Sequence, residues 1–140
     1  MTTIDLLPEA DKDAEKAVYD ALRAYNIDRF GPSGYKALQI ALRDNEGKVI
    51  GGLMGETARG WLFIKLLFVP EEQRGKGLAT RMLQMAEDEA RARGCVGLQI
   101  DTMSPEALAL YLRYGFRIAG RIEGLSGGHD LTWLTRRIDG

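Results

Sequence analysis

The stretch WLFIKLLFVP EEQRGKGLAT RMLQMAEDEA, residues 61–90, decides the fold of this 140-residue chain. Its first nine residues are apolar apart from Lys65, which predicts a strand that is buried on both faces. Gly75 and Gly77 predict a turn, and the residues after them predict an amphipathic helix whose charged side chains, Glu87 among them, lie opposite the apolar stripe. A helix N-terminus behind a glycine turn directs main-chain N–H groups at one place, which suits an anion such as a phosphate.

The composition predicts a single globular domain over residues 1–140. Apolar residues make up 45% of the chain, which argues against disorder and supplies a core. The net charge of −1 argues against nucleic-acid binding, and the longest apolar run is too short to span a membrane. One cysteine and one histidine argue against a disulfide and against a metal site. Without a signal-peptide pattern at the N-terminus, the expected location is the cytoplasm.

The remaining sequence predicts an α+β fold, with a mixed, mostly antiparallel central sheet flanked by helices. Gly51, Gly52 and Gly55 fall inside a predicted strand and mark a bulge or a close approach of another backbone. A loop over residues 124–128 is expected to carry His129. The predicted order is a helix from Asp11, a hairpin of strands 35–43 and 49–57, the buried strand 61–69, the helix after Gly77, strand 96–101, a helix from Ser104 to Tyr114, and strands 116–121 and 131–138.

The glycine turn matches neither of two common nucleotide-binding patterns. A dinucleotide-binding turn has three glycines and follows directly after the first strand. Here the third glycine is absent, the glycines lie several residues past the strand, and three strands precede the turn. The spacing of a P-loop is absent as well. An ordinary surface turn remains the alternative, but Arg74 and Lys76 beside the glycines and the helix directly behind them favour an anion site.

Two motifs make the sequence resemble the GNAT N-acetyltransferases. The first is the Gln/Arg-x-x-Gly-x-Gly/Ala pattern of the acetyl-CoA turn, and the second is Ala-x-x-x-Tyr-x-x-x-Gly-Phe. They occur in the family's order, separated by a helix and a strand, and the resemblance covers roughly residues 35–138. The matching residues are Arg74, Gly77 and Ala79 in the first motif, and Ala107, Tyr111, Gly115 and Phe116 in the second.

The resemblance implies acetyl-CoA as the cosubstrate. It places the pyrophosphate on the N–H groups of the glycine turn, close to the N-terminus of the following helix. The pantetheine arm is expected to pair like an added strand with the end of the buried strand, where the neighbouring strand around residues 99–102 splays away. The implied contacts are Leu67, Phe68, Val69, Arg74, Gly75, Lys76, Gly77, Leu78, Ala79 and Thr80.

The implied reaction is the direct transfer of an acetyl group to a primary amine of a small molecule or peptide. By its motif position, Tyr111 is the acid for the departing CoA thiolate, although a core tyrosine is the reading without the motif. Some family members carry a glutamate on the buried strand, where this chain has Phe63 and Lys65. Glu56 and Asp101 are therefore the candidate bases. A base acting through water, or no dedicated base, stays open.

The acceptor identity does not follow from the sequence. The expected substrate mouth includes Tyr25 and Asn26 on the first helix, and His129 before the last strand. A homodimer is compatible with the family. Because the strand acid is missing, a CoA-binding sensor or interaction domain without catalysis remains the alternative function.

Overall fold

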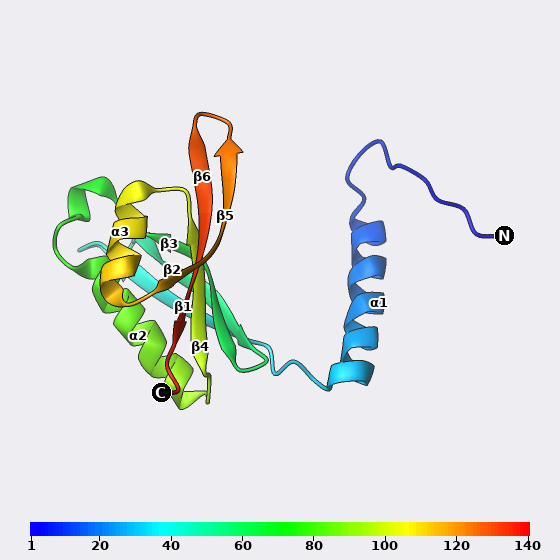
Figure 1. Cartoon of the computed structure of the whole chain (residues 1–140), viewed down its shortest axis with the longest axis horizontal. Helices are drawn as coiled ribbons and strands as arrows, with labels where there is room; N and C mark the ends of the chain where they lie inside the picture. Colours follow the sequence, from blue (N-terminus) through cyan, green and yellow to red (C-terminus); the bar gives the residue numbers. More distant parts are fainter. The chain divides into compact units, whose positions relative to one another are not determined.

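The computed structural model describes residues 1–140, and its elements follow the predicted order (Figure 1). Contacts between Cα atoms divide the chain into two compact units, Met1–Ser33 and Gly34–Gly140. The first unit holds helix α1 (Lys12–Phe30). The second unit holds β1 (Lys36–Arg43), β2 (Val49–Ala58), β3 (Trp61–Phe68), a 3-10 turn (Glu71–Gln73), α2 (Leu78–Ala92), β4 (Gly97–Thr102), α3 (Pro105–Tyr114), β5 (Arg117–Leu125) and β6 (His129–Arg137).

Helix α1 is capped at both ends by local hydrogen bonds. The Asp11 carboxylate accepts from the main-chain N–H groups of Asp13 at 2.9 Å and Ala14 at 3.0 Å. At the other end, the N–H of Gly31 donates to the carbonyl of Ile27 at 2.8 Å, with Gly31 at a φ of +81°. None of the helix residues is buried. No helix of the chain is both long enough and apolar enough to cross a membrane.

The second unit is built on a six-stranded sheet in the order β1-β2-β3-β4-β6-β5. Every neighbouring pair is antiparallel except β3 and β4, which run parallel because α2 returns the chain to the sheet between them. Strand β3 therefore lies inside the sheet, as its continuous apolar sequence predicts. The predicted α+β class with a mostly antiparallel sheet is confirmed.

The parallel pair β3–β4 separates soon after it forms. Only three residue pairs join the strands, and the last of them is Phe63 with Gln99. Beyond this pair β3 continues to Phe68 and β4 continues to Thr102 without pairing to each other. The two halves of the sheet thus diverge, and the predicted splay beside the end of β3 is present.

A bulge and close glycine contacts shape the neighbouring pair β2–β3. Gly55 pairs with Ile64 and Met54 pairs with Leu66, so Lys65 is an extra residue on β3. A Cβ atom on Gly55 would lie 2.5 Å from the carbonyl oxygen of Phe63, closer than real Cβ contacts. The glycines of β2 therefore mark both a bulge and a close backbone approach, as predicted from their position within a strand.

The core lies between one face of the sheet and helices α2 and α3, which Figure 1 shows side by side on that face. The opposite face carries Phe63, Gln99 and Thr135, which the strand register places in one row. These three side chains are only half-buried. The core residues with the lowest exposure are Leu53, Leu62, Leu83, Ala86, Ala90, Leu98 and Leu134.

Glu87 corrects the predicted polarity of α2. The sequence places it on the charged, solvent-facing side, but its exposure is only 4%. Its carboxylate accepts hydrogen bonds from the hydroxyl of Tyr114 at 2.9 Å, from Arg136 Nε at 3.1 Å and from Arg91 Nη2 at 2.9 Å. The Arg91 guanidinium also donates to the carbonyl of Ile138. Glu87 is buried because these three donors compensate its charge, and it joins α2, α3 and β6.

Candidate functional site

A cleft of about 770 Å³ runs along the gap between β3 and β4. Its walls are the second half of β3, the glycine turn with the first turn of α2, the end of β4, and one face of α3. Elements that the sequence separates by dozens of residues therefore meet at one elongated site. The lining includes Lys65, Leu66, Leu67, Phe68, Val69, Gln73, Arg74, Gly75, Gly77, Leu78, Ala79, Thr80, Ile100, Asp101, Thr102, Ser104, Glu106, Ala107, Leu110, Tyr111 and Arg113.

The glycine turn presents main-chain N–H groups to this cleft. Gly75 and Gly77 have φ values of +80° and +74°, a left-handed conformation that glycine adopts readily. No heavy atom other than those of adjacent residues lies within 4 Å of a Cβ built on either glycine. Gly77 is the N-cap of α2 and supplies no side-chain cap, so the first N–H groups of the helix keep their capacity to bind an anion.

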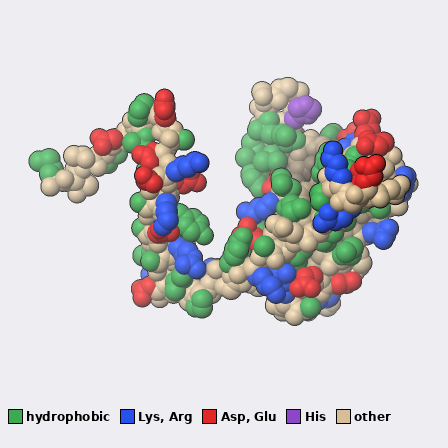
Figure 2. All heavy atoms as spheres, turned by 180° about the vertical axis from the view of Figure 1, so that it is seen from behind, with side chains coloured by type: hydrophobic (Ala, Val, Ile, Leu, Met, Phe, Trp, Pro, Cys, Tyr) green, Lys and Arg blue, Asp and Glu red, His purple; other side chains and the backbone are tan.

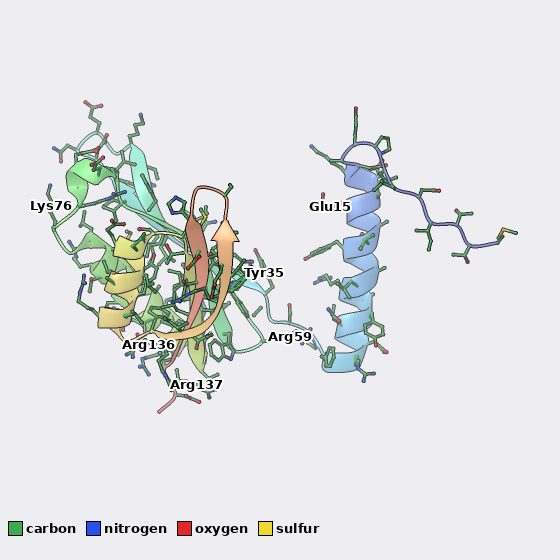
Figure 3. All side chains as sticks on the ribbon, turned by 45° about the horizontal axis from the view of Figure 1, so that its top comes forward. Glu15, Tyr35, Arg59, Lys76, Arg136 and Arg137 are labelled. Atoms are coloured by element: carbon green, nitrogen blue, oxygen red, sulfur yellow. The ribbon has the colours of Figure 1, made fainter.

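The two cations of the turn fold back onto it. Arg74 Nε donates to the carbonyl of Val69 at 2.9 Å, and Lys76 Nζ donates to Gln73 Oε1 at 2.9 Å. Lys76 lies at the outer edge of the turn (Figure 3) and does not line the cleft. The other nine residues predicted to contact acetyl-CoA all line it.

The end of β3 offers unpaired main-chain groups on the side of β4. Leu67 and Phe68 line the cleft beyond the last pair between the two strands. Their other side is occupied, since Leu67 pairs with Leu53 and Phe68 pairs with Gly52 of β2. An extended ligand could therefore add itself to β3 only from the cleft.

Tyr111 reaches the cleft from the middle of α3. Its side chain is 5% exposed and packs against Phe116, with ring centroids 5.9 Å apart. Burial raises the pKa of Tyr111 to about 12, and the negative charge of Asp101 adds to the shift. The phenol therefore keeps its proton at neutral pH and can donate a hydrogen bond. Tyr114, one turn later, bonds Glu87 and does not line the cleft.

The structure separates the two candidate bases. Asp101 lies at the end of β4, lines the cleft and acts electrostatically on Tyr111. Glu56 lies on β2, where its carboxylate is 3.7 Å from Lys65 Nζ, and it does not line the cleft. Only Asp101 therefore shares the cleft with Tyr111.

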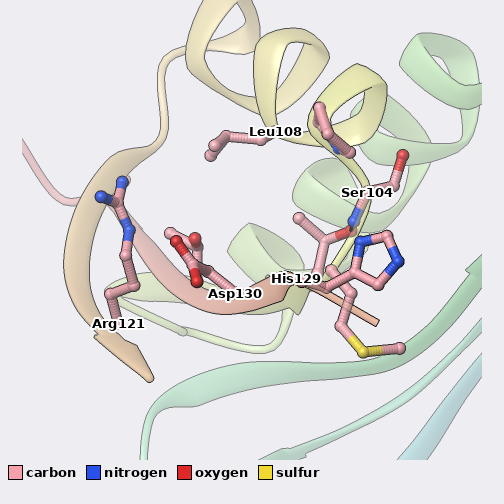
Figure 4. A pocket seen from close by; sticks show the side chains of 10 residues that line it. Ser104, Leu108, Arg121, His129 and Asp130 are labelled. Carbon is pink, nitrogen blue, oxygen red and sulfur yellow. Dashed lines mark hydrogen bonds between the residues drawn. The ribbon is translucent and has the colours of Figure 1, made fainter. Parts of the chain in front are cut away.

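A second cavity of about 280 Å³ lies between the start of α3 and the β5–β6 hairpin (Figure 4). It shares Thr102 and Ser104 with the cleft, so the two sites adjoin at the turn between β4 and α3. His129 lines this cavity, but it is the first residue of β6, not part of a loop over residues 124–128. The remaining lining residues are Met103, Pro105, Leu108, Arg121, Gly128, Asp130 and Thr132.

Not every predicted mouth residue joins these cavities. His129 is exposed near the tip of the hairpin, where Figure 2 shows the single histidine in purple. Tyr25 and Asn26 belong to α1 in the first unit, and their role stays a prediction. No group of three or more histidine, cysteine, aspartate or glutamate side chains is arranged to hold a metal ion.

Sequence reasoning missed Glu106, Arg113, Arg121 and Asp130. Glu106 and Arg113 both border the cleft and lie seven residues apart, on the same side of α3. Tyr111 lies five residues after Glu106 and two before Arg113, so its motif position does not predict them. Arg121 and Asp130 carry no comparable signal. They meet only because β5 and β6 pair as a hairpin beside α3.

Cys95 needs no functional role in this arrangement. It is buried, and burial raises the pKa of its thiol. It lines neither cavity. A small apolar side chain in the core accounts for it.

The relatives of this chain in sequence are acetyltransferases. The sequence pattern of the Acetyltransferase (GNAT) family matches residues 4–116. Acetyltransferase Atu2258 of Agrobacterium fabrum is 55% identical over 129 residues, which cover 92% of this chain and 94% of that protein. Blasticidin-S acetyltransferase of Streptomyces morookaense is 40% identical over 93 residues, covering 66% and 68% of the two chains.

A solved structure shows the same similarity in three dimensions. The crystal structure of a protein assigned as an acetyltransferase from Agrobacterium tumefaciens superposes with a TM-score of 0.94. Its sequence is 52% identical, and the match covers 98% of this chain and 100% of that chain.

Proposed function

The chain belongs to the acetyltransferase (GNAT) family, and from this premise we propose that it transfers the acetyl group of acetyl-CoA directly to a primary amine of a small molecule or peptide. The observation that carries the proposal is the single cleft in which the glycine turn, the unpaired edge of β3 and Tyr111 meet. A relative named for a small molecule, blasticidin-S, supports a small-molecule acceptor.

The cleft has a place for each part of acetyl-CoA. Gly75, Gly77 and the first turn of α2 present N–H groups that would hold the pyrophosphate. Leu67 and Phe68 present main-chain groups that would pair with the amides of the pantetheine arm. This arrangement would direct the thioester along β3 toward Tyr111 and Asp101, because the glycine turn lies at the other end of the strand.

The reaction forms a C–N bond between the amine and the acetyl carbon and breaks the C–S bond of the thioester. The amine must attack as a free base, and the carbonyl oxygen becomes an oxyanion that needs a hydrogen-bond donor. Lys65, the bulge residue, has no partner residue on β2 or on β4, so a main-chain N–H group there would be a candidate donor. The proton lost by the nitrogen and the negative charge on the departing sulfur must then be combined.

Tyr111 would stabilise the departing thiolate by donating a hydrogen bond. Its pKa of about 12 lies roughly 3.5 pH units above that of an ordinary thiol. Full proton transfer from the phenol is therefore unfavourable on its own, and the proton released by the attacking amine restores the neutral state of the pair. Asp101 would accept that proton, directly or through water, because it lines the cleft and its charge acts on Tyr111.

Replacing Tyr111 by Phe tests the catalytic part of the proposal. Release of CoA thiol across a panel of amines should fall by about 10- to 100-fold, while the affinity for CoA changes little. Tyr114→Phe is the matched control, because it removes a hydroxyl from the same helix outside the cleft. Equal turnover in the Tyr111→Phe variant and the wild type would remove Tyr111 as the hydrogen-bond donor.

Replacing Gly77 by Glu tests the coenzyme part. A glutamate would have to adopt a φ of +74° and would place a negative charge at the expected pyrophosphate position. CoA binding, measured by calorimetry on the folded variant, should be lost. If CoA binds the wild type but no amine accepts an acetyl group, the result supports the alternative of a CoA-binding domain without catalysis.

A further inference from the structure

The second cavity is lined by a cationic and an anionic side chain that do not form an ion pair with each other. Arg121 on β5 and Asp130 on β6 both extend into it, as Figure 4 shows. No ion pair joins them, and neither forms an ion pair with another side chain. Leu108 and Met103 complete the lining with apolar surface. A charged guanidinium beside a partly apolar cavity is suited to binding an anionic group.

Arg121 is the arginine of the cavity, and its guanidinium is available to an anion. The N-terminus of α3 also borders the cavity, but its donors are already used, because Ser104 Oγ accepts from the N–H of Ala107 at 3.2 Å. The Glu106 carboxylate accepts from its own main-chain N–H, which lowers the pKa of this side chain. The guanidinium of Arg121, in contrast, forms no hydrogen bond and no ion pair within the chain. The affinity for an anion therefore depends on its guanidinium.

Asp130 adds a negative charge to the same cavity. One of its carboxylate oxygens accepts from the N–H of Gly124 at 3.2 Å, which holds the side chain in the hairpin. Its negative charge repels a second charge on the ligand, so a singly charged carboxylate is favoured over a phosphate dianion. The planar guanidinium of Arg121 also matches the two oxygens of a carboxylate.

The cavity adjoins the acetyl-CoA cleft, with which it shares Thr102 and Ser104. We propose that this cavity binds the carboxylate of an acceptor that carries both an amine and a carboxylate, with Arg121 as the carboxylate-binding residue. The amine then extends past Thr102 toward the thioester end of the cleft. The acceptor class is that of amino acids, with the amine on the α-carbon or further along. This inference rests on the proposed acetyltransferase function.

Matched acceptors test the inference. The panel pairs α-, β- and ω-amino acids with their carboxamides and with the corresponding amines that lack the carboxyl group. Thiol release from acetyl-CoA gives kcat/KM for each member, and we expect at least one amino acid to exceed its carboxamide by about 10- to 100-fold. Phosphonate analogues of the same compounds should be poorer acceptors than the carboxylates.

Two variants make the assignment specific. Arg121→Gln should lower kcat/KM for the preferred amino acid by about 10- to 100-fold and leave its carboxamide within about threefold. Arg117→Gln is the control, because Arg117 lies on the same strand but lines neither cavity. Equal rates for acid and carboxamide, or an equal loss for both in Arg121→Gln, would overturn the inference while leaving the acetyltransferase function intact.

Binding measurements separate this inference from the proposed function. If no amine is acetylated, calorimetry with the amino acids in the presence of CoA still reports on the cavity. A preference for carboxylates that disappears in Arg121→Gln supports the cavity assignment even though the acetyl transfer fails. Absence of any carboxylate preference among the tested compounds overturns it.

Discussion

At the residue scale, Gly52 is the glycine at which an added Cβ atom would make the closest contact. A Cβ atom there would lie 2.2 Å from the carbonyl oxygen of Ile40, and the φ of Gly52 is +148°. Both obstacles are main-chain features of paired strands, so neither can move without breaking the β1–β2 ladder. The glycine is therefore required by the sheet itself, independently of any ligand.

Gly52→Ala should lower the free energy of unfolding by about 2–4 kcal/mol, from the clash and the unfavourable φ together. Gly47→Ala is the matched control, because Gly47 also has a positive φ, +83°, but no atoms near a built Cβ. Its expected cost is about 1–2 kcal/mol. Urea unfolding of both variants measures the difference, and equal costs would show that the β1–β2 contact is less close than described.

The residue scale also shows where sequence reasoning succeeds and where it ends. Tyr111 is predictable because its motif fixes its sequence distance from Gly115 and Phe116, which directly follow the same helix. Arg121 and Asp130 were not, because their proximity depends on a hairpin register that contains two shifts. Local spacing predicts residues on one element well, whereas residues from different elements need the assembled sheet.

At the element scale, the Glu87 carboxylate holds α2, α3 and β6 together. Burial by itself would raise the pKa of Glu87, but hydrogen bonds from Arg136, Arg91 and Tyr114 outweigh it and lower the pKa below 4.5. The stabilisation is therefore present above pH 4.5 and is lost as the pH falls through the lowered pKa. It also fixes the helix that carries the catalytic candidate Tyr111.

Glu87→Gln should lower the free energy of unfolding by about 3 kcal/mol or more at pH 7, because two arginines lose their buried partner. The difference from the wild type should shrink below pH 4.5. Denaturant unfolding between pH 3 and 7 measures both effects. Glu89→Gln is the control, since Glu89 pairs with Arg93 at the surface, and we expect little change there. A pH-independent difference would contradict the carboxylate role.

The unpaired edge of β3 gives a second prediction at this scale. Main-chain amides of residues 64–68 that face β4 lack a strand partner, so they should exchange hydrogen faster than paired amides of the same strand. Addition of CoA should slow this exchange, because the pantetheine arm would supply partners. Hydrogen exchange with mass spectrometry measures the change, and unchanged exchange at saturating CoA would contradict strand-like binding.

Some elements were longer than their sequence pattern indicates. The sequence predicts that β5 ends at residue 121, but this strand continues to Leu125. It predicts that β6 begins at residue 131, but this strand already begins at His129. Gly124 was interpreted as a loop residue because glycine favours turns. Here its φ of +76° falls within a register shift between Ile122 and Leu125, so the irregularity is absorbed inside the hairpin.

At the scale of the whole molecule, the core residues all lie in the unit Gly34–Gly140. Helix α1 buries none of its residues, and a single helix of this length is marginally stable in water. The chain order and the helix boundaries were predictable from periodicity and caps.

A chain that begins at residue 34 should therefore keep a cooperative thermal unfolding transition. Circular dichroism measures the transition, and the full chain is the reference. We expect the midpoint to stay within a few degrees, because every residue of the hydrophobic core belongs to the unit Gly34–Gly140. Loss of cooperativity in the truncated chain would show that α1 is part of the packed structure in solution.

The gap between β3 and β4 has a further consequence for self-association. Unpaired strand edges at the margin of a sheet can recruit strands from other molecules and start aggregation. Here the edge kept open for a ligand lies in the middle of the sheet, between β3 and β4, while the outer margins are β1 and β5. Those margins carry charged residues such as Lys36, Arg43 and Arg117. The fold thus keeps main-chain hydrogen-bonding groups ready for a small molecule without offering them to a neighbouring protein.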